Sequence, residues 1–259
     1  MNGIRYDNIE KKEALKILEG YLDEPGQKRN VFFLNIDCIY KAQNDQDYAN
    51  ILRTKADLVL GDGIGIRLLT RLQGEKMAEN LNGTDFSPEL MKLAAGKKKS
   101  VHLLGGYDGV AEKAGRKFSL LTGVKVAGTH TGYFKDDQRV IDHINNSGAD
   151  ILFVGFGVPQ QEKWIIKYRQ ALKPSICLGV GALFDYNAGR IKRSPRLFRT
   201  MHLEWLWRVF MEPARLFHRY FICDIPLLFR LSLSGTKITK DPSWGKPPGK
   251  VLHPPGLQT

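Results

Sequence analysis

The chain of 259 residues alternates short apolar runs with longer segments in which apolar positions recur every three or four residues. The first pattern predicts strands buried on both faces, and the second predicts amphipathic helices. Six runs are predicted as strands: 30–36, 56–61, 100–106, 124–130, 149–157 and 174–181. Seven segments are predicted as helices: 7–22, 46–55, 63–73, 85–96, 109–121, 136–147 and 159–171. This alternation predicts an α/β fold with a Rossmann-like, mostly parallel sheet and flanking helices.

Glycine clusters follow most of the predicted strands. In a parallel α/β sheet, ligands bind beyond the carboxyl ends of the strands, where the turns lead into helices. The predicted site is therefore a row of turns at 61–65, 105–106, 128–132, 155–157 and 179–181.

The composition changes after residue 190. From 190 to 237, ten Lys and Arg residues stand against three acidic residues, with aromatic and aliphatic residues between them. This pattern predicts a basic, amphipathic helical appendage that associates with a membrane surface; a helix pair docked on the sheet is the alternative. The expected organisation is a catalytic core at 1–189, the appendage at 190–237 and a Pro/Gly-rich, disordered tail at 238–259.

The net charge of +12 favours an anionic partner, which nucleic acid, lipid headgroups and phosphorylated substrates all satisfy. Three widely spaced cysteines suggest neither disulfides nor a zinc site, so a reducing compartment is expected. The first residues lack the apolar core of a signal peptide, and no segment approaches the roughly 18 uninterrupted apolar residues of a membrane span. Any membrane contact is therefore expected to be peripheral.

The segment "LVLGDGIGIRLL" at 58–69 carries a carboxylate, Asp62, inside a glycine-rich turn. Its spacing lacks the third glycine of a dinucleotide fingerprint, because Ile66 stands at that position. A carboxylate there would repel a pyrophosphate but suits a general base that accepts a proton from a sugar hydroxyl. An N-cap for the following helix is the alternative, and the spacing alone does not decide between them.

Two further glycine turns suit a nucleotide-sugar. In "GFGVPQQEKWI" at 155–165, glycines end a predicted strand and Gln161 follows at a helix start. In "VHLLGGYDG" at 101–109, the N–H groups of Gly105 and Gly106 suit a diphosphate. Each turn, taken alone, also fits a tight connection without a ligand.

No metal site is expected. The "DQD" at 45–47 resembles a metal-binding carboxylate motif, but it opens a predicted helix and capping is the favoured interpretation. The six histidines have no ligand spacing. Only His130, beside a glycine turn, is placed near the predicted site, whereas His102 lies within a predicted strand and is interpreted as structural.

Seven segments in a fixed order resemble the WecG/TagA/CpsF family of glycosyltransferases over residues 4–230. They read "GDGIGI", "NGTDF", "LLGGYDGVAEKA", "GTHTGYF", "GFGVPQQEKW", "GVGALFDYNAGRIKRSPRLF" and "LEWLWRVFMEPARLFHRYF". The resemblance implies a bacterial, inverting, metal-independent enzyme that moves a sugar from a UDP-sugar to a polyprenyl-diphosphate-linked saccharide. It also implies that the product is used to make an envelope polymer, which is exopolysaccharide, teichoic acid or common antigen.

Position by position, the resemblance implies that Asp62 is the catalytic base and that Asn35 and Gln161 belong to the active site. The residues expected to bind the UDP-sugar are Gly61, Gly63, Asp85, Gly105, Gly106, Gly155, Gly157 and His130. The residues expected to bind the acceptor diphosphate are Arg208, Arg215 and Arg219. Two positions depart from the family pattern, because Phe33 stands where Thr is common and Asn80 where Arg is common. These departures leave the donor sugar open.

The expected location is the cytoplasmic face of the bacterial inner membrane, with an anionic surface as partner and no cofactor. Nucleic acid is not an expected partner, and the sequence does not specify whether the chain forms a homo-oligomer. The alternatives are a nicotinamide-dependent oxidoreductase and a non-catalytic basic module that binds nucleic acid. Asp62 and Gln161 in separate glycine turns favour the enzyme over both.

Overall fold

The computed structural model describes residues 4–24, 26–191, 206–207, 223–233 and 238–239. Its strands are β1 (Arg29–Leu34), β2 (Leu58–Gly61), β3 (Ser100–Gly105), β4 (Lys125–His130), β5 (Ile151–Gly155) and β6 (Ile176–Gly179). Its helices in the predicted core are α1 (Lys11–Asp23), α2 (Ile36–Asn44), α3 (Gln46–Thr54), α4 (Ile64–Leu72), α5 (Gly83–Gly96), α6 (Val110–Thr122), α7 (Asp137–Asn146), α8 (Gln160–Tyr168) and α9 (Leu183–Asn187). The six predicted strands and seven predicted helices of the core are confirmed.

The pattern missed α2 and α9. No glycine or proline separates β1 from α2, and the chain changes conformation at Asn35, whose side chain accepts a hydrogen bond from the Cys38 N–H at 3.0 Å. This cap ends the strand at Leu34 and starts the helix. The predicted first helix begins later than expected, at Lys11, because Asp7 pairs with β2 and its carboxylate accepts the Val59 N–H at 2.7 Å.

All six strands run parallel, in the order β2-β1-β6-β5-β3-β4. The predicted Rossmann-like α/β fold is therefore confirmed. In every strand except β4, alternate side chains enter different core clusters: Phe32 and Leu34 lie on one face of β1, and Val31 and Phe33 on the other. Both faces are buried in five of the six strands, as the continuous apolar runs predict. The prediction is wrong for β4, which lies at the edge of the sheet, is exposed at Lys125 and is only partly buried beyond it.

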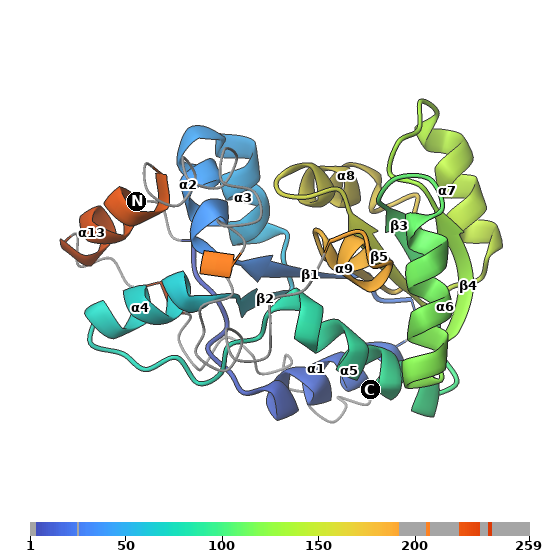
Figure 1. Cartoon of the computed structure of the whole chain (residues 1–259), viewed down its shortest axis with the longest axis horizontal. Helices are drawn as coiled ribbons and strands as arrows, with labels where there is room; N and C mark the ends of the chain where they lie inside the picture. The colour runs from blue at the N-terminus through green and yellow to red at the C-terminus, as the bar shows by residue number, and fades with distance from the viewer. Residues whose placement is uncertain (1–3, 25, 192–205, 208–222, 234–237, 240–259) are drawn as a thin grey trace, which may run out of the picture.

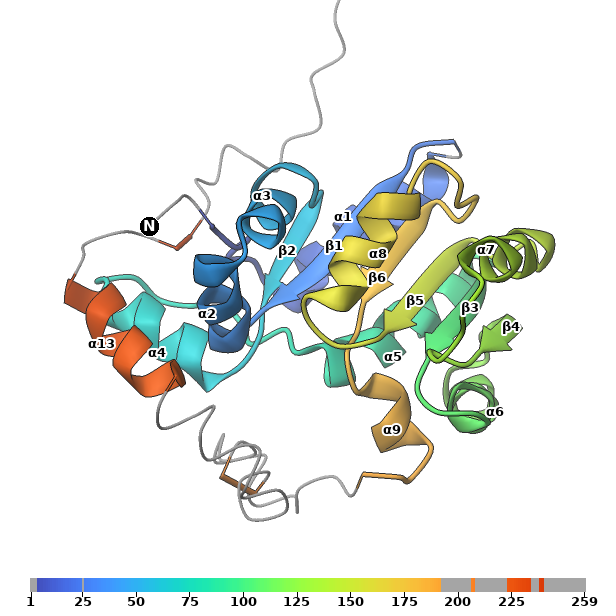
Figure 2. The same cartoon turned by 90° about the horizontal axis from the view of Figure 1, so that it is seen from above.

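Helices cover both faces of the sheet and form a three-layer structure (Figures 1 and 2). The layer on one face contains α2, α3, α7 and α8, and the layer on the other contains α1, α5, α6 and α9. After β1 and β5 the chain passes to the first layer, and after β3 and β6 it passes to the second. The chain therefore leaves neighbouring strands toward opposite faces of the sheet in three pairs: β1 and β6, β6 and β5, and β5 and β3. Sheets of this kind bind their ligands at the carboxyl ends of such neighbouring strands.

The described part of the predicted appendage includes α13 (Ile225–Leu233), which buries Leu227 and Leu231 against the first layer beside α4. Beyond it, Ile238 is buried, and its carbonyl accepts the Tyr6 N–H at 2.8 Å. Arg208, Arg215 and Arg219 lie outside the described residues, as does the predicted tail from residue 240. Within the described residues, the helices are all too short or too polar to span a lipid bilayer.

Candidate active site

The turn after β2 holds Asp62 by contacts to two separate segments. The Asp62 N–H donates to the Leu34 carbonyl at 2.8 Å, and the Gly61 carbonyl accepts from the Leu81 N–H at 2.9 Å. The next N–H, of Gly63, donates to the Asn80 side-chain oxygen at 2.7 Å. Gly63 has φ +92° and stands at the N-cap position of α4, one residue after Asp62. The half-buried Asp62 therefore sits in a fixed turn at the carboxyl end of the sheet.

Asn35 and Asp62 are brought together by strand pairing. Leu34 pairs with Gly61 in the parallel register, so the residues that follow them leave adjacent strands at the same edge. Asn35 is half-buried, and its side-chain oxygen caps α2. The structure therefore places both predicted residues at the β1–β2 end of the site.

Gln161 is buried, at 3% exposure, and supports a neighbouring turn. Its side-chain oxygen accepts the Gly181 N–H at 2.8 Å, and its amide donates to the Glu162 carboxylate at 2.7 Å. A Cβ on Gly179 would lie 2.7 Å from this amide, so a larger residue there would displace the Gln161 side chain. These contacts tie the turn after β6 to the start of α8.

Glu162 is fully buried beside Gln161, and one of its carboxylate oxygens has no hydrogen-bond partner. Burial raises the pKa of Glu162 to about 7, against smaller lowering effects from the Gln161 hydrogen bond and the charge of Lys41. The Lys41 ammonium itself donates to the Val158 carbonyl at 2.9 Å, just before the start of α8. A titratable group thus lies directly behind the turns after β5 and β6.

The predicted donor-binding glycines fall into two groups. A Cβ on Gly61, Gly105 or Gly155 would lie less than 3.0 Å from neighbouring protein atoms, so packing alone requires glycine at these positions. Gly63 and Gly157 have positive φ values of +92° and +80°, and nothing lies within 4 Å of an added Cβ. Their turns are therefore open to a ligand on that side. Gly106 combines a positive φ with close packing against Val110.

An exposed aromatic pair stands beside the turns after β3 and β4. The rings of Tyr107 and Tyr133 stack with centroids 4.6 Å apart, and the side chains are 48% and 65% exposed. The Arg190 guanidinium lies 3.9 Å from the Tyr107 ring centroid and pairs with Asp185 at 3.1 Å. Exposed, oriented rings of this kind suit stacking against a planar base.

The remaining predicted residues have local contacts. Asp85 is exposed in the first turn of α5, and its carboxylate accepts from the Asn82 amide at 2.9 Å, beside the Asn82 cap. His130 ends β4, and its Nδ1 lies 2.8 Å from the Thr131 carbonyl. Asp45 of the "DQD" segment caps α3 by accepting the Tyr48 N–H at 3.0 Å, as predicted. Among the described residues, no group of His, Cys, Asp and Glu side chains is arranged to hold a metal ion.

The family model of the glycosyl transferase WecG/TagA/CpsF family matches residues 1–241. The chain belongs to this family. It is 35% identical to a protein of Bacillus spizizenii over 75% of its own length and 76% of the relative's. It is 30% identical to one of Bacillus subtilis over 83% and 84%, and 26% identical to one of Staphylococcus aureus over 92% and 93%. All three are named N-acetylglucosaminyldiphosphoundecaprenol N-acetyl-beta-D-mannosaminyltransferase.

The two departures from the family pattern have structural explanations in this glycosyltransferase. Phe33 points into the core, where its ring meets Phe86 edge-on at 6.1 Å and lies against Gly83. Asn80 accepts the Gly63 N–H, which a guanidinium cannot do because it has only donors. The turn that carries Asp62 is therefore held by a contact specific to an amide or carboxylate at residue 80.

The sequence did not single out Glu162, Tyr107 or Tyr133, and it did not predict the contact of Asn80 with the Gly63 N–H. Tyr107 and Tyr133 each follow a glycine turn at the end of a predicted strand, and this placement was an available signal. Glu162 gave none, because the polar stretch "QQEK" does not show which side chain turns inward.

Proposed function

We propose that this glycosyltransferase moves a sugar from a UDP-sugar to a polyprenyl-diphosphate-linked saccharide in bacterial envelope polysaccharide synthesis. The observation that carries the proposal is the pairing of the Asn35 and Asp62 turns at the carboxyl edge of the sheet, in a family member. The names of the relatives support a lipid-linked acceptor and make UDP-N-acetylmannosamine the first donor to test.

In the proposed reaction, the Asp62 carboxylate accepts the proton of an acceptor hydroxyl. The hydroxyl oxygen bonds to the anomeric carbon on the face opposite UDP, the bond from that carbon to the UDP oxygen breaks, and its electron pair leaves with UDP. The configuration at the anomeric carbon is thereby inverted. The Asp62 turn is fixed by Leu34, Leu81 and Asn80, so the base needs no rearrangement to reach its position.

Several of the predicted site residues have a place in this proposal. Asn35 and His130 line the edge, and Gly106 and Gly157 offer backbone N–H groups to the diphosphate, whereas the Gly63 N–H is donated to Asn80. The Tyr107–Tyr133 pair carries the uracil ring by stacking. Gln161, which the sequence placed among the catalytic residues, acts as a positioning residue because both ends of its amide bind within the protein.

The leaving UDP is proposed to need no metal ion, because the protein's own donors stabilise its charge. Residues 190–237, with Arg208, Arg215 and Arg219, are proposed to bind the acceptor diphosphate at the cytoplasmic face of the inner membrane. The net charge of +12 supports both an anionic substrate and an anionic surface.

The test is a transfer assay with a panel of UDP-sugars and a polyprenyl-diphosphate-linked N-acetylglucosamine, with the product's anomeric configuration read by NMR. Transfer with inversion in excess EDTA is expected. A retained configuration would contradict the single displacement, and activity that disappears with EDTA and returns with Mg²⁺ would contradict metal independence. A thermal-shift comparison of UDP-sugars, NAD and single-stranded DNA separates this function from the two alternatives, because a ligand of the native state raises its melting temperature.

A further inference from the structure

Two neighbouring helices leave apolar stripes uncovered. The exposed fractions on α4 are 39% for Ile64, 44% for Leu68 and 51% for Leu72, and those on α13 are 36% for Ile225, 68% for Phe229 and 86% for Leu233. A spacing of four places each set near one face of its helix. These six residues, called here the α4–α13 surface, include most of the exposed large hydrophobic side chains in the described part of the chain.

The two helices are anchored by their other faces. Ile66 and Leu69 of α4, and Leu227 and Leu231 of α13, are buried in the same core cluster. Figures 1 and 2 both show α4 and α13 side by side at one end of the molecule, and the two helices contact each other. The uncovered stripes therefore belong to a fixed surface of the fold.

The charge of this surface selects an anionic occupant. Arg67 and Arg71 are exposed on α4 next to its stripe, and Arg230 is exposed on α13. The nine residues of each helix contain no Asp or Glu. An apolar face bordered by arginines fits a bilayer, in which the side chains enter the acyl boundary and the guanidinium groups meet lipid phosphates. A second copy of the chain would instead bring the same arginines against one another.

The α4–α13 surface lies next to the turn that carries the proposed base. Helix α4 begins at Ile64, two residues after Asp62. We propose that the α4–α13 surface docks in the plane of an anionic bilayer and holds the Asp62 turn at the level of the lipid headgroups. The inference rests on the proposed function, because a polyprenyl-diphosphate acceptor presents its saccharide at that level. At nine residues, or about 14 Å, each helix is long enough to lie in the interface and too short to cross the membrane.

The test uses the full chain and vesicles of phosphatidylcholine with or without phosphatidylglycerol. Leu68→Glu/Leu72→Glu on α4 and, separately, Phe229→Glu on α13 change the surface. Leu120→Glu/Leu121→Glu is the matched control for the double variant, because these leucines of α6 are 87% and 61% exposed at the other end of the sheet (Figure 1). Both surface variants are expected to bind anionic vesicles at least about tenfold more weakly than wild type, and the control is expected to bind like wild type.

Kinetics with two acceptors distinguish docking from damage to the site. With the acceptor in vesicles, the surface variants are expected to lose at least about tenfold in transfer rate, and with a short-chain, water-soluble acceptor they are expected to match wild type. Vesicle binding equal to wild type in both variants overturns the proposal, and equal losses with both acceptors do so too. A change of oligomeric state, read by light scattering, with unchanged vesicle binding would assign the surface to contacts between copies. If wild type binds vesicles but transfers to neither acceptor, the proposed function fails instead.

Discussion

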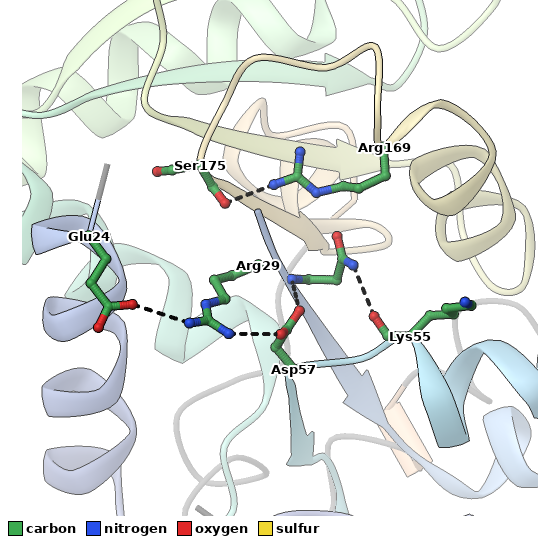
Figure 3. Close-up of polar contacts among 7 residues, drawn as sticks. Glu24, Arg29, Lys55, Asp57, Arg169 and Ser175 are labelled. Carbon is green, nitrogen blue, oxygen red and sulfur yellow. Dashed lines mark hydrogen bonds and ion pairs between the residues drawn. The ribbon is translucent and has the colours of Figure 1, made fainter. Parts of the chain in front are cut away.

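The amino ends and the carboxyl ends of the parallel strands, called here the amino edge and the carboxyl edge of the sheet, are built from different chemistry. At the amino edge, the Asp57 carboxylate precedes β2 and accepts the Asn30 N–H of neighbouring β1 at 2.8 Å (Figure 3). Arg29 pairs with the same carboxylate at 3.3 Å and with Glu24 of the α1 end at 3.2 Å. These side chains hold the start of β1 to the residue before β2 and to the end of α1 with charge-assisted hydrogen bonds.

The same device recurs before β5. Asp150 accepts the Ser100 N–H of neighbouring β3 at 2.9 Å and pairs with Lys99 at 3.0 Å. Burial raises the pKa of Asp150, but the bonds from Ser100 and Lys99 outweigh it and leave the pKa below its usual value. The stability that this carboxylate contributes is therefore present above its unfolded pKa and is lost as the pH falls into the acid range.

The carboxyl edge, by contrast, is formed by glycine turns that are held by backbone hydrogen bonds and by the neutral amides of Asn80 and Gln161. Asp62 and Gly157 stand in turns that are fixed but open on one side. We infer from this difference that the amino edge serves stability and the carboxyl edge serves binding, so substitutions at the two edges should separate these properties. The following predictions test that separation, from the largest expected effect to the smallest.

The largest effect is expected at the proposed base. Asp62→Asn keeps the size of the side chain but removes its basicity, so turnover should fall by about 10²-fold or more, with UDP binding and melting temperature nearly unchanged. Transfer kinetics and calorimetric titration with UDP measure this. If the variant keeps most of the wild-type rate, Asp62 is not the base.

The second effect is a pH dependence of stability from Glu162, behind the carboxyl edge. Its pKa is raised in the folded state to about 7, so the folded protein holds a proton that the unfolded chain releases. The stability contributed is present below the unfolded pKa and is lost as the pH rises through about 7. Glu162→Gln removes this loss and should stabilise the protein by about 2 kcal/mol more at pH 8 than at pH 5, relative to wild type. Urea titrations at the two pH values measure it, and an equal difference at both would contradict it.

The third effect is expected at the amino edge. Asp150→Ala leaves the buried start of β3 without its acceptor and should lower the free energy of unfolding by about 1–2 kcal/mol without changing kcat of the folded enzyme. Glu89→Ala, which removes an exposed pair with Lys92 on α5, is the control and should change stability by less than about 0.5 kcal/mol. A loss of kcat in folded Asp150→Ala would break the separation of the two edges.

The smallest effect is expected at Asn80. Asn80→Ala removes the acceptor for the Gly63 N–H and should loosen the Asp62 turn, which lowers kcat by about tenfold at most and leaves the donor KM nearly unchanged. Asn80→Asp keeps an acceptor oxygen and is the matched control. The positional role would be excluded if the two variants had the same kcat or if Asn80→Ala matched wild type.

The sequence by itself determined the layers of this glycosyltransferase and the edge of the sheet that carries its candidate site. Strand and helix periodicity predicted the six strands and most helices, because burial on both faces requires continuous apolar runs. The glycine clusters that begin at Gly61 and Gly105 marked the carboxyl edge of the sheet. Glycine is needed wherever another group approaches the backbone closely, and this need shows in the sequence itself. The resemblance to the family added the residue roles.

Only the tertiary structure decided which side chains support the turns and which face the open site. The Gly63–Asn80 and Gln161–Gly181 contacts join residues 17 and 20 positions apart. The Tyr107–Tyr133 stack likewise needs β3 and β4 side by side. Local pattern reports whether a residue prefers water or the core, but a hydrogen bond or a stacked ring depends on a partner that only chain folding brings within reach.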